Sequence, residues 1–198
     1  VLYRTDAVGC IPGILDLWFA KRVEYKDKMK KYGNSGDKEK YAFYYKRQLV
    51  QKILLNSLYG VLGLPAFRFY DVDNATAVTT TGQTVIKSTA DMANIKYNKE
   101  LGDPDLDSNI YIDTDSVFFS AVPLMDKRTP NWKDEDQDTI AGYVNDIAEE
   151  MQDYLNDFYD IMSTKIFNVD KENHRLEIKK EYVAKAGLWI AKKRYAQW

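Results

Sequence analysis

Apolar positions in the first third of the chain recur at the spacing of amphipathic helices. They predict one helix from Ile11 to about Lys31, with Pro12 in the first turn, where proline is tolerated. Residues 32–37 are rich in glycine, asparagine and serine and interrupt this pattern. A second helical pattern covers residues 38–62, so we expect two long helices that form an antiparallel hairpin.

The pattern changes after the second helix. Pro65 and the β-leaning run 67–70 separate the helical hairpin from the rest of the chain. Asp73 or Asn74 is a suitable N-cap for a third helix that reaches about Tyr97.

The C-terminal half alternates between strand and helix patterns. Residues 109–122 are expected to form two strands that meet at a tight turn, and residues 140–162 an amphipathic helix. Residues 176–184 and 188–195 are expected to be two further strands. These elements predict an α+β fold, in which helices pack on an antiparallel sheet and the two-helix hairpin projects as a subdomain. We expect plain solvent exposure for the acidic outer face of the 140–162 helix, which carries Asp146, Glu149, Glu150, Asp153 and Asp157.

The composition excludes several classes of site. The chain has 198 residues, which suits one ordinary domain or two small ones. Cys10 is its only cysteine and His174 its only histidine, so a disulfide framework, a zinc site of familiar spacing, a Cys/His dyad and a Ser/His/Asp triad are excluded. No run of 18 apolar residues and no signal-peptide pattern is present, so we expect an intracellular protein without membrane insertion.

Charge is distributed in blocks along the chain. The net charge is only −2, but residues 21–52 carry eleven Lys and Arg against four Asp and Glu. Residues 99–160 carry four basic against seventeen acidic residues, and residues 170–198 carry eight against four. Such alternation suits a protein that holds a polyanion and also binds a divalent metal, although charge runs are often only solvated faces.

Two aspartates flank Thr114 at the turn expected within residues 109–122. Residues i and i+2 of an extended chain point to one side, which places the carboxylates of Asp113 and Asp115 about 6–7 Å apart. Mg²⁺ typically takes one or two carboxylates and leaves its other positions to substrate phosphate and water. Because aspartate is also a preferred turn residue, the sequence Asp113-Thr114-Asp115-Ser116 by itself leaves a solvated turn open as the alternative.

A polar stripe lies on the second predicted helix, which is almost wholly apolar from residue 49 to 64. An unpaired buried charge costs several kcal/mol, so a lysine on such a helix needs a partner. If Arg22 and Lys26 of the first helix face Lys52, three cations converge, and a triphosphate is a natural anion between them. The alternative is that Lys52 only extends to water. Spacings of four, four and three define the stripe, which consists of Gln48, Lys52, Asn56 and Tyr59.

Three short segments of the chain together form a pattern that is highly specific for one protein family. They are Lys-Ile-Leu-Leu-Asn-Ser-Leu-Tyr-Gly at 52–60, Tyr-Ile-Asp-Thr-Asp-Ser at 111–116 and Lys-Lys-Arg-Tyr at 192–195. In this order they resemble motifs B and C and the Lys-Lys-Arg-Tyr segment of family B DNA polymerases. Residues 67–83 look most like the replicative polymerases of tailed bacteriophages, and residues 9–26 are similar to the family's entry into the first fingers helix.

The resemblance implies a domain organisation and an activity. Residues 1–64 would be the fingers hairpin and residues 65–198 part of the palm. The intact enzyme would transfer nucleotides from dNTP to a primer 3′-hydroxyl during DNA replication. Two Mg²⁺ ions would bridge the palm carboxylates, one at the 3′-hydroxyl and one at the β- and γ-phosphates. The implied partners are primer-template DNA, dNTP, the remainder of the polymerase chain and a sliding clamp, and the implied location is the cytoplasm of a bacterial host if a phage encodes the protein.

The resemblance also implies roles for individual residues. Asp115 falls on the essential metal ligand of motif C, with Asp113 as its companion, and Glu181 is a candidate for an additional palm carboxylate. Tyr59 falls on the position that packs under the nascent base pair. The positions that grip the incoming triphosphate are Arg22, Lys26, Lys52 and Asn56. The positions assigned to DNA are Lys192, Lys193, Arg194 and Tyr195, of which Lys193 and Tyr195 hold the primer end through the minor groove.

The sequence departs from the family pattern in two ways. Ile112 replaces the glycine most usual in motif C, and its side chain is expected to point away from the metals. Motif A, Asp-x-x-Ser-Leu-Tyr-Pro, does not occur in these 198 residues. We therefore expect an internal fragment without motif A, the exonuclease region or the thumb. The alternative is a noncatalytic nucleic-acid-binding or assembly module that keeps the polymerase fold.

Overall fold

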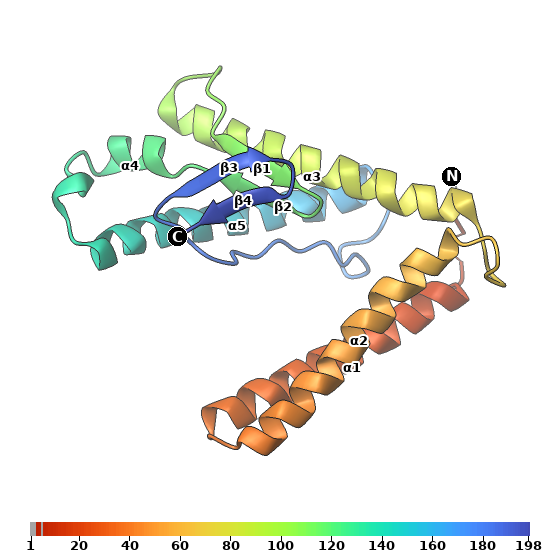
Figure 1. Cartoon of the computed structure of the whole chain (residues 1–198). Helices are drawn as coiled ribbons and strands as arrows, with labels where there is room; N and C mark the ends of the chain where they lie inside the picture. The colour runs from red at the N-terminus through yellow and green to blue at the C-terminus, as the bar shows by residue number, and fades with distance from the viewer. Residues whose placement is uncertain (1–2, 5) are drawn as a thin grey trace. The chain divides into compact units, whose positions relative to one another are not determined.

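Two long helices, α1 (Cys10–Asn34) and α2 (Lys38–Leu62), form the predicted antiparallel hairpin (Figure 1). The structure is a computed structural model that describes residues 3–4 and 6–198. Asp37 begins α2, because its side chain accepts a hydrogen bond from the Lys40 N–H at 3.0 Å. The expected hairpin is therefore confirmed.

Aromatic rings join the two helices near the tip of the hairpin. Tyr32 of α1 stacks on Tyr44 of α2, with ring centroids 5.5 Å apart and planes inclined by only 3°. Gly33 lies beside Tyr41, since a Cβ atom on this glycine would be 3.2 Å from Cδ2 of the tyrosine. These contacts fix the register of α1 against α2.

The segment between α2 and α3 (Val72–Leu101) consists of turns. Residues 67–70, which lean towards β structure in sequence, form no strand, because the N–H groups of Phe67 and Tyr70 bond to carbonyl oxygens three residues earlier. The expected caps of α3 were also wrong. Asp71 serves instead, since its Oδ1 accepts from the N–H groups of residues 73 and 74, both at 3.0 Å.

The chain divides into two units between Thr80 and Thr81, inside α3. We expected a boundary after residue 64, between the segments assigned to the fingers and to the palm. The division inside α3 does not test that assignment, which stays a prediction. Among the described residues, no helix is long and apolar enough to span a membrane.

The core of the second unit lies around α5 (Gln137–Lys165), the helix predicted over 140–162. Its apolar face packs with the later part of α3, where Thr89 Oγ1 and the hydroxyl of Tyr159 are 2.7 Å apart and share a hydrogen bond. The acidic face of α5 is exposed, as expected, but Glu149 pairs with Lys180 at 2.7 Å and Glu150 pairs with Arg128 at 2.8 Å. The fully enclosed residues of this core are Ala93, Tyr97, Leu124, Met125, Ile147, Met151 and Leu155.

Arg128 ties three helices together at one edge of this core. It ends α4 (Val122–Arg128), a helix too short for its periodicity to be read from sequence. Its Nε is 2.6 Å from Oε1 of Glu100 on α3, and its Nη2 is 2.8 Å from Oε2 of Glu150 on α5. The guanidinium holds the pKa of both carboxyl groups below their usual range, and the two carboxylates raise the pKa of Arg128.

Two antiparallel β-hairpins complete the unit. The first pairs β1 (Asn109–Asp113) with β2 (Ser116–Phe119), as predicted, and the second pairs β3 (Gly187–Ala191) with β4 (Arg194–Gln197). They are separate two-stranded ladders. The α+β class is confirmed, but the single strand expected over 188–195 was wrong, since the chain reverses there.

Residues 176–184, which we call the strap, form no strand and run along α5 instead. Asn156 accepts from the Ile178 N–H at 2.9 Å and donates to its carbonyl oxygen at 3.1 Å. Gln152 accepts from the N–H of Lys180 at 2.9 Å. The strand prediction was wrong because amide side chains of α5 satisfy the strap backbone, which strand periodicity cannot reveal.

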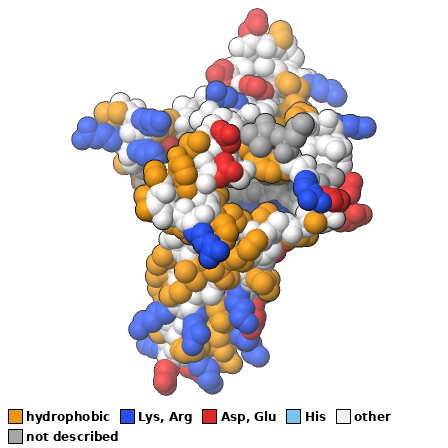
Figure 2. All heavy atoms as spheres, turned by 90° about the vertical axis from the view of Figure 1, so that its right-hand side faces the viewer, with side chains coloured by type: hydrophobic (Ala, Val, Ile, Leu, Met, Phe, Trp, Pro, Cys, Tyr) orange, Lys and Arg blue, Asp and Glu red, His pale blue; other side chains and the backbone are white. Residues whose placement is uncertain are grey.

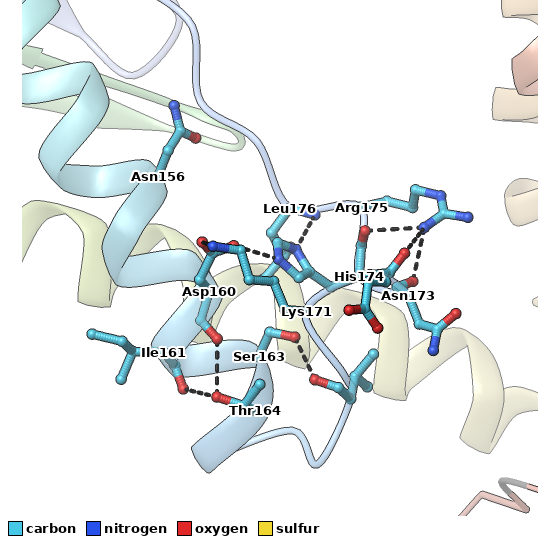
Figure 3. A network of polar contacts seen from close by, with 12 residues as sticks. Asn156, Asp160, Ile161, Ser163, Thr164, Lys171, Asn173, His174, Arg175 and Leu176 are labelled. Carbon is cyan, nitrogen blue, oxygen red and sulfur yellow. Dashed lines mark hydrogen bonds and ion pairs between the residues drawn. The ribbon is translucent and has the colours of Figure 1, made fainter.

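His174 anchors the loop that joins α5 to the strap (Figure 3). Its Nδ1 accepts a hydrogen bond from the Leu176 N–H at 3.2 Å, which leaves Nε2 to donate to Asp160 Oδ1 at 2.8 Å. Lys171 pairs with the other oxygen of Asp160 at 2.6 Å. Lys171 first, and then His174, lower the pKa of this carboxyl group. The only histidine of the chain therefore has a structural place.

Candidate active site

The two aspartates of 113–116 lie at a two-residue turn between β1 and β2. Thr114 has φ 50°, and the Asp115 N–H donates to the Asp113 carbonyl oxygen at 2.6 Å. The chain is therefore sharply turned at Thr114, and the extended backbone expected between Asp113 and Asp115 was wrong. Aspartate favours turns, which is why strand alternation fails here, although a positive φ is unusual for the β-branched Thr114.

The two carboxylates have different surroundings. The Asp113 side chain is only 14% exposed, and its Oδ1 accepts from the Thr114 hydroxyl at 3.0 Å. Asp115 is exposed. Asp115 is therefore the carboxylate more open to a ligand.

The donor set of this turn fits a hard divalent cation such as Mg²⁺, which prefers carboxylate oxygens and takes only one or two from protein. Within residues 3–4 and 6–198, however, no third acidic, histidine or cysteine side chain joins Asp113 and Asp115 in a metal-binding group. Glu181, on the strap, is exposed and is not grouped with them. Any metal held here would take its remaining ligands from substrate, water or another segment.

The turn of the second hairpin meets the aspartate turn. Lys193 has φ 61° and, with Lys192, forms the reversal between β3 and β4. Its backbone N–H donates to the hydroxyl of Tyr111 at 2.8 Å, and its Nζ is 3.5 Å from Asp113 Oδ1. The segments 111–116 and 192–195, far apart in sequence, thus form one site.

An aromatic cluster holds the two hairpins against each other. The ring of Tyr195 lies 5.5 Å from the rings of both Tyr111 and Phe118. Trp189 adds contacts at 6.1 Å to Phe118 and 6.4 Å to Tyr195. Only glycine fits at 187, because a Cβ atom there would overlap the indole of Trp189. Sequence reasoning assigned no role to Tyr111, Phe118 or Trp189, although aromatic residues on facing strands are a signal for such packing.

The remaining residues of the basic segment are open to solvent. Lys192 and Arg194 are exposed, and Tyr195 is 39% exposed despite its contacts. Lys192 lies in the turn and Arg194 and Tyr195 lie in β4, so the four residues do not follow the alternation of one strand.

The polar stripe of α2 belongs to the first unit. Lys52, Asn56 and Tyr59 are all exposed, and Gln48 is partly buried. The exposure of Lys52 removes the argument that burial forces an anion onto it. The exposure of Lys52 is compatible both with the triphosphate role and with a solvated lysine.

Arg22 and Lys52 lie level with each other on one flank of the hairpin. Arg22 precedes Gly33 by eleven residues, and Lys52 follows Tyr41 by eleven. Eleven residues are about three helical turns, or about 16 Å. Arg22 on α1 and Lys52 on α2 are therefore equally far from the Gly33–Tyr41 contact and on the same side of the hairpin. Lys26, two turns before Gly33, lies on this flank as well.

Arg22 is partly buried, and its Nε is shielded from solvent without a hydrogen-bond partner. Lys26 and Lys52 are exposed beside it on the same flank. Three cations therefore share one side of the hairpin, a geometry that suits a multiply charged anion. We call the side defined by Arg22, Lys26, Gly33, Tyr41 and Lys52 the cationic flank.

A family model described as DNA polymerase family B matches residues 3–131. The chain is 32% identical over 158 residues to the "DNA-directed DNA polymerase" of Enterobacteria phage T4, a match that covers 75% of this chain and 17% of the relative. The corresponding protein of Escherichia phage RB69 gives the same identity and coverage.

A more distant relative matches nearly the whole chain. The "DNA polymerase" of Thermococcus gorgonarius is 29% identical over 191 residues, 96% of this chain and 20% of the relative. The chain thus spans about a fifth of the length of the curated relatives it matches.

Proposed function

Because this chain belongs to DNA polymerase family B, we propose that it supplies the fingers and part of the palm of a template-directed DNA polymerase. In that assignment residues 1–64 are the fingers and residues 65–198 the palm segment. The observation that carries the proposal is the contact of Lys193 with Asp113, which unites two polymerase-like motifs in one site. The longer enzyme transfers a nucleotide from dNTP to the primer 3′-hydroxyl.

The carboxylates of Asp115 and Asp113 hold divalent metal in this proposal. When bound, Mg²⁺ supplies positive charge to the reacting oxygens and to the phosphates that leave. Asp115, exposed at the turn, is the main ligand, and Asp113 is held by Thr114 and Lys193 beside it. The other ligands come from motif A, outside these 198 residues.

The segment 192–195 holds the primer end. Lys193 is already within reach of the aspartates, so a duplex that contacts Lys193 and Tyr195 has its 3′ end beside Asp113. Contacts of this kind go to the sugar-phosphate backbone and the minor groove, so base pairing with the template and not the protein selects the sequence.

The three cations of the cationic flank hold the triphosphate in this proposal. Arg22, Lys26 and Lys52 neutralise the phosphates and Asn56 adds an amide contact, while Tyr59 lies two turns beyond Lys52 for packing against the base. These roles follow from family positions, and the level placement of Arg22 and Lys52 supports them.

The test is primer extension by a longer polymerase that contains this chain and a motif A segment. Asp115→Asn is expected to lower kcat on the order of a hundredfold or more with little change in DNA affinity, because a metal ligand is lost. Asp105→Asn, in the exposed loop before β1, is the matched control and keeps full activity. Equal rates for both variants would overturn the assignment of the aspartate turn.

The second candidate function is a noncatalytic nucleic-acid-binding module. The two-carboxylate turn without a third ligand among the described residues favours it for the 198-residue chain by itself. That chain is expected to bind primer-template DNA but to incorporate no dNTP above a buffer blank. Template-dependent incorporation by the chain alone would contradict this expectation.

A further inference from the structure

Two exposed tyrosines near the tip of the hairpin have no role in nucleotide transfer. Tyr41 and Tyr45, one turn apart on α2, stack with ring centroids 6.4 Å apart and planes inclined by 18°. They remain 41% and 46% exposed. A stacked pair that still presents half of its surface to water is available for a further ring.

The pair continues the stripe of α2 that carries Lys52. Tyr45 precedes Lys52 by seven residues, which is about two helical turns, so both lie on the same side of α2. Lys38 lies about one turn before Tyr41 and is exposed on this side as well. On α1 the neighbouring cation is Lys26. The tyrosine pair therefore lies on the cationic flank, on the tip side of Lys52.

Glu24 and Glu39 lie away from this flank, whereas Asp37, one turn before Tyr41, lies on it and pairs with Lys40 at 3.1 Å. Glu24 is nine residues before Gly33, half a turn around α1, and its carboxylate pairs with Lys28 at 2.6 Å. Glu39 is two residues before Tyr41 and therefore on the other side of α2. Lysine and arginine side chains alternate with hydrophobic ones over the hairpin in the lower part of Figure 2. The flank thus combines exposed rings with more basic than acidic side chains.

We propose that Tyr41 and Tyr45, with Lys38, bind single-stranded DNA. Exposed rings set among cations are the features with which proteins bind single strands, because unpaired bases stack on aromatic side chains while lysines contact the phosphates. A duplex is a poorer ligand, because its bases are stacked on one another and offer no free face. This site extends the proposed function. It rests on that function in one respect only, the choice of DNA as the polymer that binds.

Single-stranded DNA suits the site better than a protein partner. The hairpin region 21–52 has a balance of +7, which a polyanion neutralises along its length. The tyrosine pair would give the strand a fixed point two to three turns from Lys52, outside the triphosphate contact. The hairpin would then hold an unpaired strand at its tip and a nucleotide nearer its base.

The experiment measures binding of a fluorescein-labelled 12-nucleotide oligothymidylate to the 198-residue chain by anisotropy. An abasic strand of equal length and a blunt duplex serve as comparison ligands. The double variant Tyr41→Leu/Tyr45→Leu keeps apolar side chains but removes the rings. The matched control is Phe43→Leu, which removes a ring that is 50% exposed on the opposite side of α2. Circular dichroism checks that each variant retains its helices.

We expect the double variant to bind oligothymidylate at least about fivefold more weakly, while Phe43→Leu changes the affinity less than about twofold. The abasic strand should bind the wild type and the double variant equally, because it has no base to stack. Unchanged oligothymidylate affinity in the double variant, or equal loss in Phe43→Leu, overturns the proposal. So does a concentration-dependent dimer in sedimentation that the double variant abolishes, since the rings would then join two copies of the chain.

Binding of dATP to the same proteins separates this inference from the triphosphate assignment. The double variant should bind dATP as the wild type does, whereas Lys52→Ala should bind it more weakly. Loss of oligothymidylate binding in the double variant with no effect of Lys52→Ala on dATP supports the single-strand site and contradicts the triphosphate role. The reverse result contradicts the single-strand site alone.

Discussion

The ammonium group of Lys193 lies 3.5 Å from the carboxylate of Asp113, eighty residues earlier in the chain. Lys193 is 65% exposed and Asp113 only 14%, so the pair lies at the surface with its carboxylate sheltered. The ammonium group of Lys193 thus lies beside a carboxylate that we propose as a metal ligand. The lysine is a counterion of Asp113 and would compete with a divalent cation for it.

Removing this counterion should strengthen metal binding. Lys193→Met is expected to tighten the binding of Mn²⁺ to the chain about two- to fivefold at low salt, the range that a partly exposed ion pair provides. Mn²⁺ titration followed by electron paramagnetic resonance measures the change. Lys192→Met is the matched control, since it removes a lysine from the same turn. Equal effects of the two variants would show that only net charge matters.

Lys52→Ala should affect nucleotide capture and the chemical step together. In a longer polymerase it is expected to raise the apparent Kd for dNTP and to lower the maximal rate, for a combined loss of about 2–5 kcal/mol in kcat/KM. The reason is that phosphate charge exists before the reaction and shifts during it. Rapid-quench kinetics over a dNTP titration measure both values. A loss confined to DNA affinity would place Lys52 on the polynucleotide instead.

Gly187→Ala should loosen the contact between the hairpins. The added Cβ would overlap the indole of Trp189, so the ring must move, at a cost of about 1–3 kcal/mol in the free energy of unfolding. Gly142→Ala is the control within α5, where nothing lies within 4 Å of the added atom. It should be neutral or stabilise by about 0.5–1 kcal/mol. Chemical denaturation and near-ultraviolet circular dichroism distinguish the two.

The contribution of Arg128 should depend on pH. The pKa values of Glu100 and Glu150 are lowered in the folded chain by Arg128, so their stabilisation is complete above the unfolded pKa of about 4.3 and is lost as the pH falls through the lower folded values. Arg128→Met should therefore lower stability at pH 7, by about 1–2 kcal/mol after allowance for solvent screening. The difference from wild type should shrink below pH 4. A difference independent of pH would indicate lost packing instead.

Local patterns were sufficient to predict the four long helices and the turn of the first β-hairpin. The periodicity of residues 140–162 is strong because α5 has a side that packs and a side that meets water. The motif comparison placed Asp113, Lys193 and Tyr195 in one function, and the structure brings these three residues into one site.

The failures have a common physical cause. The strap finds its hydrogen-bond partners in Asn156 and Gln152, whose positions depend on how α5 lies and not on the strap's own residues. Likewise Lys193 and Thr114 adopt positive φ values, which their residue types do not predict. Contacts between distant segments override local propensity at these positions.

The two β-hairpins are joined through side chains and one amide, without a shared ladder, and this has a consequence for amide hydrogen exchange. The hairpins can separate as intact pieces by releasing Lys193 from Tyr111 and parting the rings, which costs less free energy than unfolding either ladder. The Lys193 amide, bonded across the junction, should exchange through this small opening. Amides paired within the β3–β4 ladder should need a larger opening. Two levels of protection from hydrogen exchange would therefore show that the aspartate and lysine turns separate while each ladder stays intact.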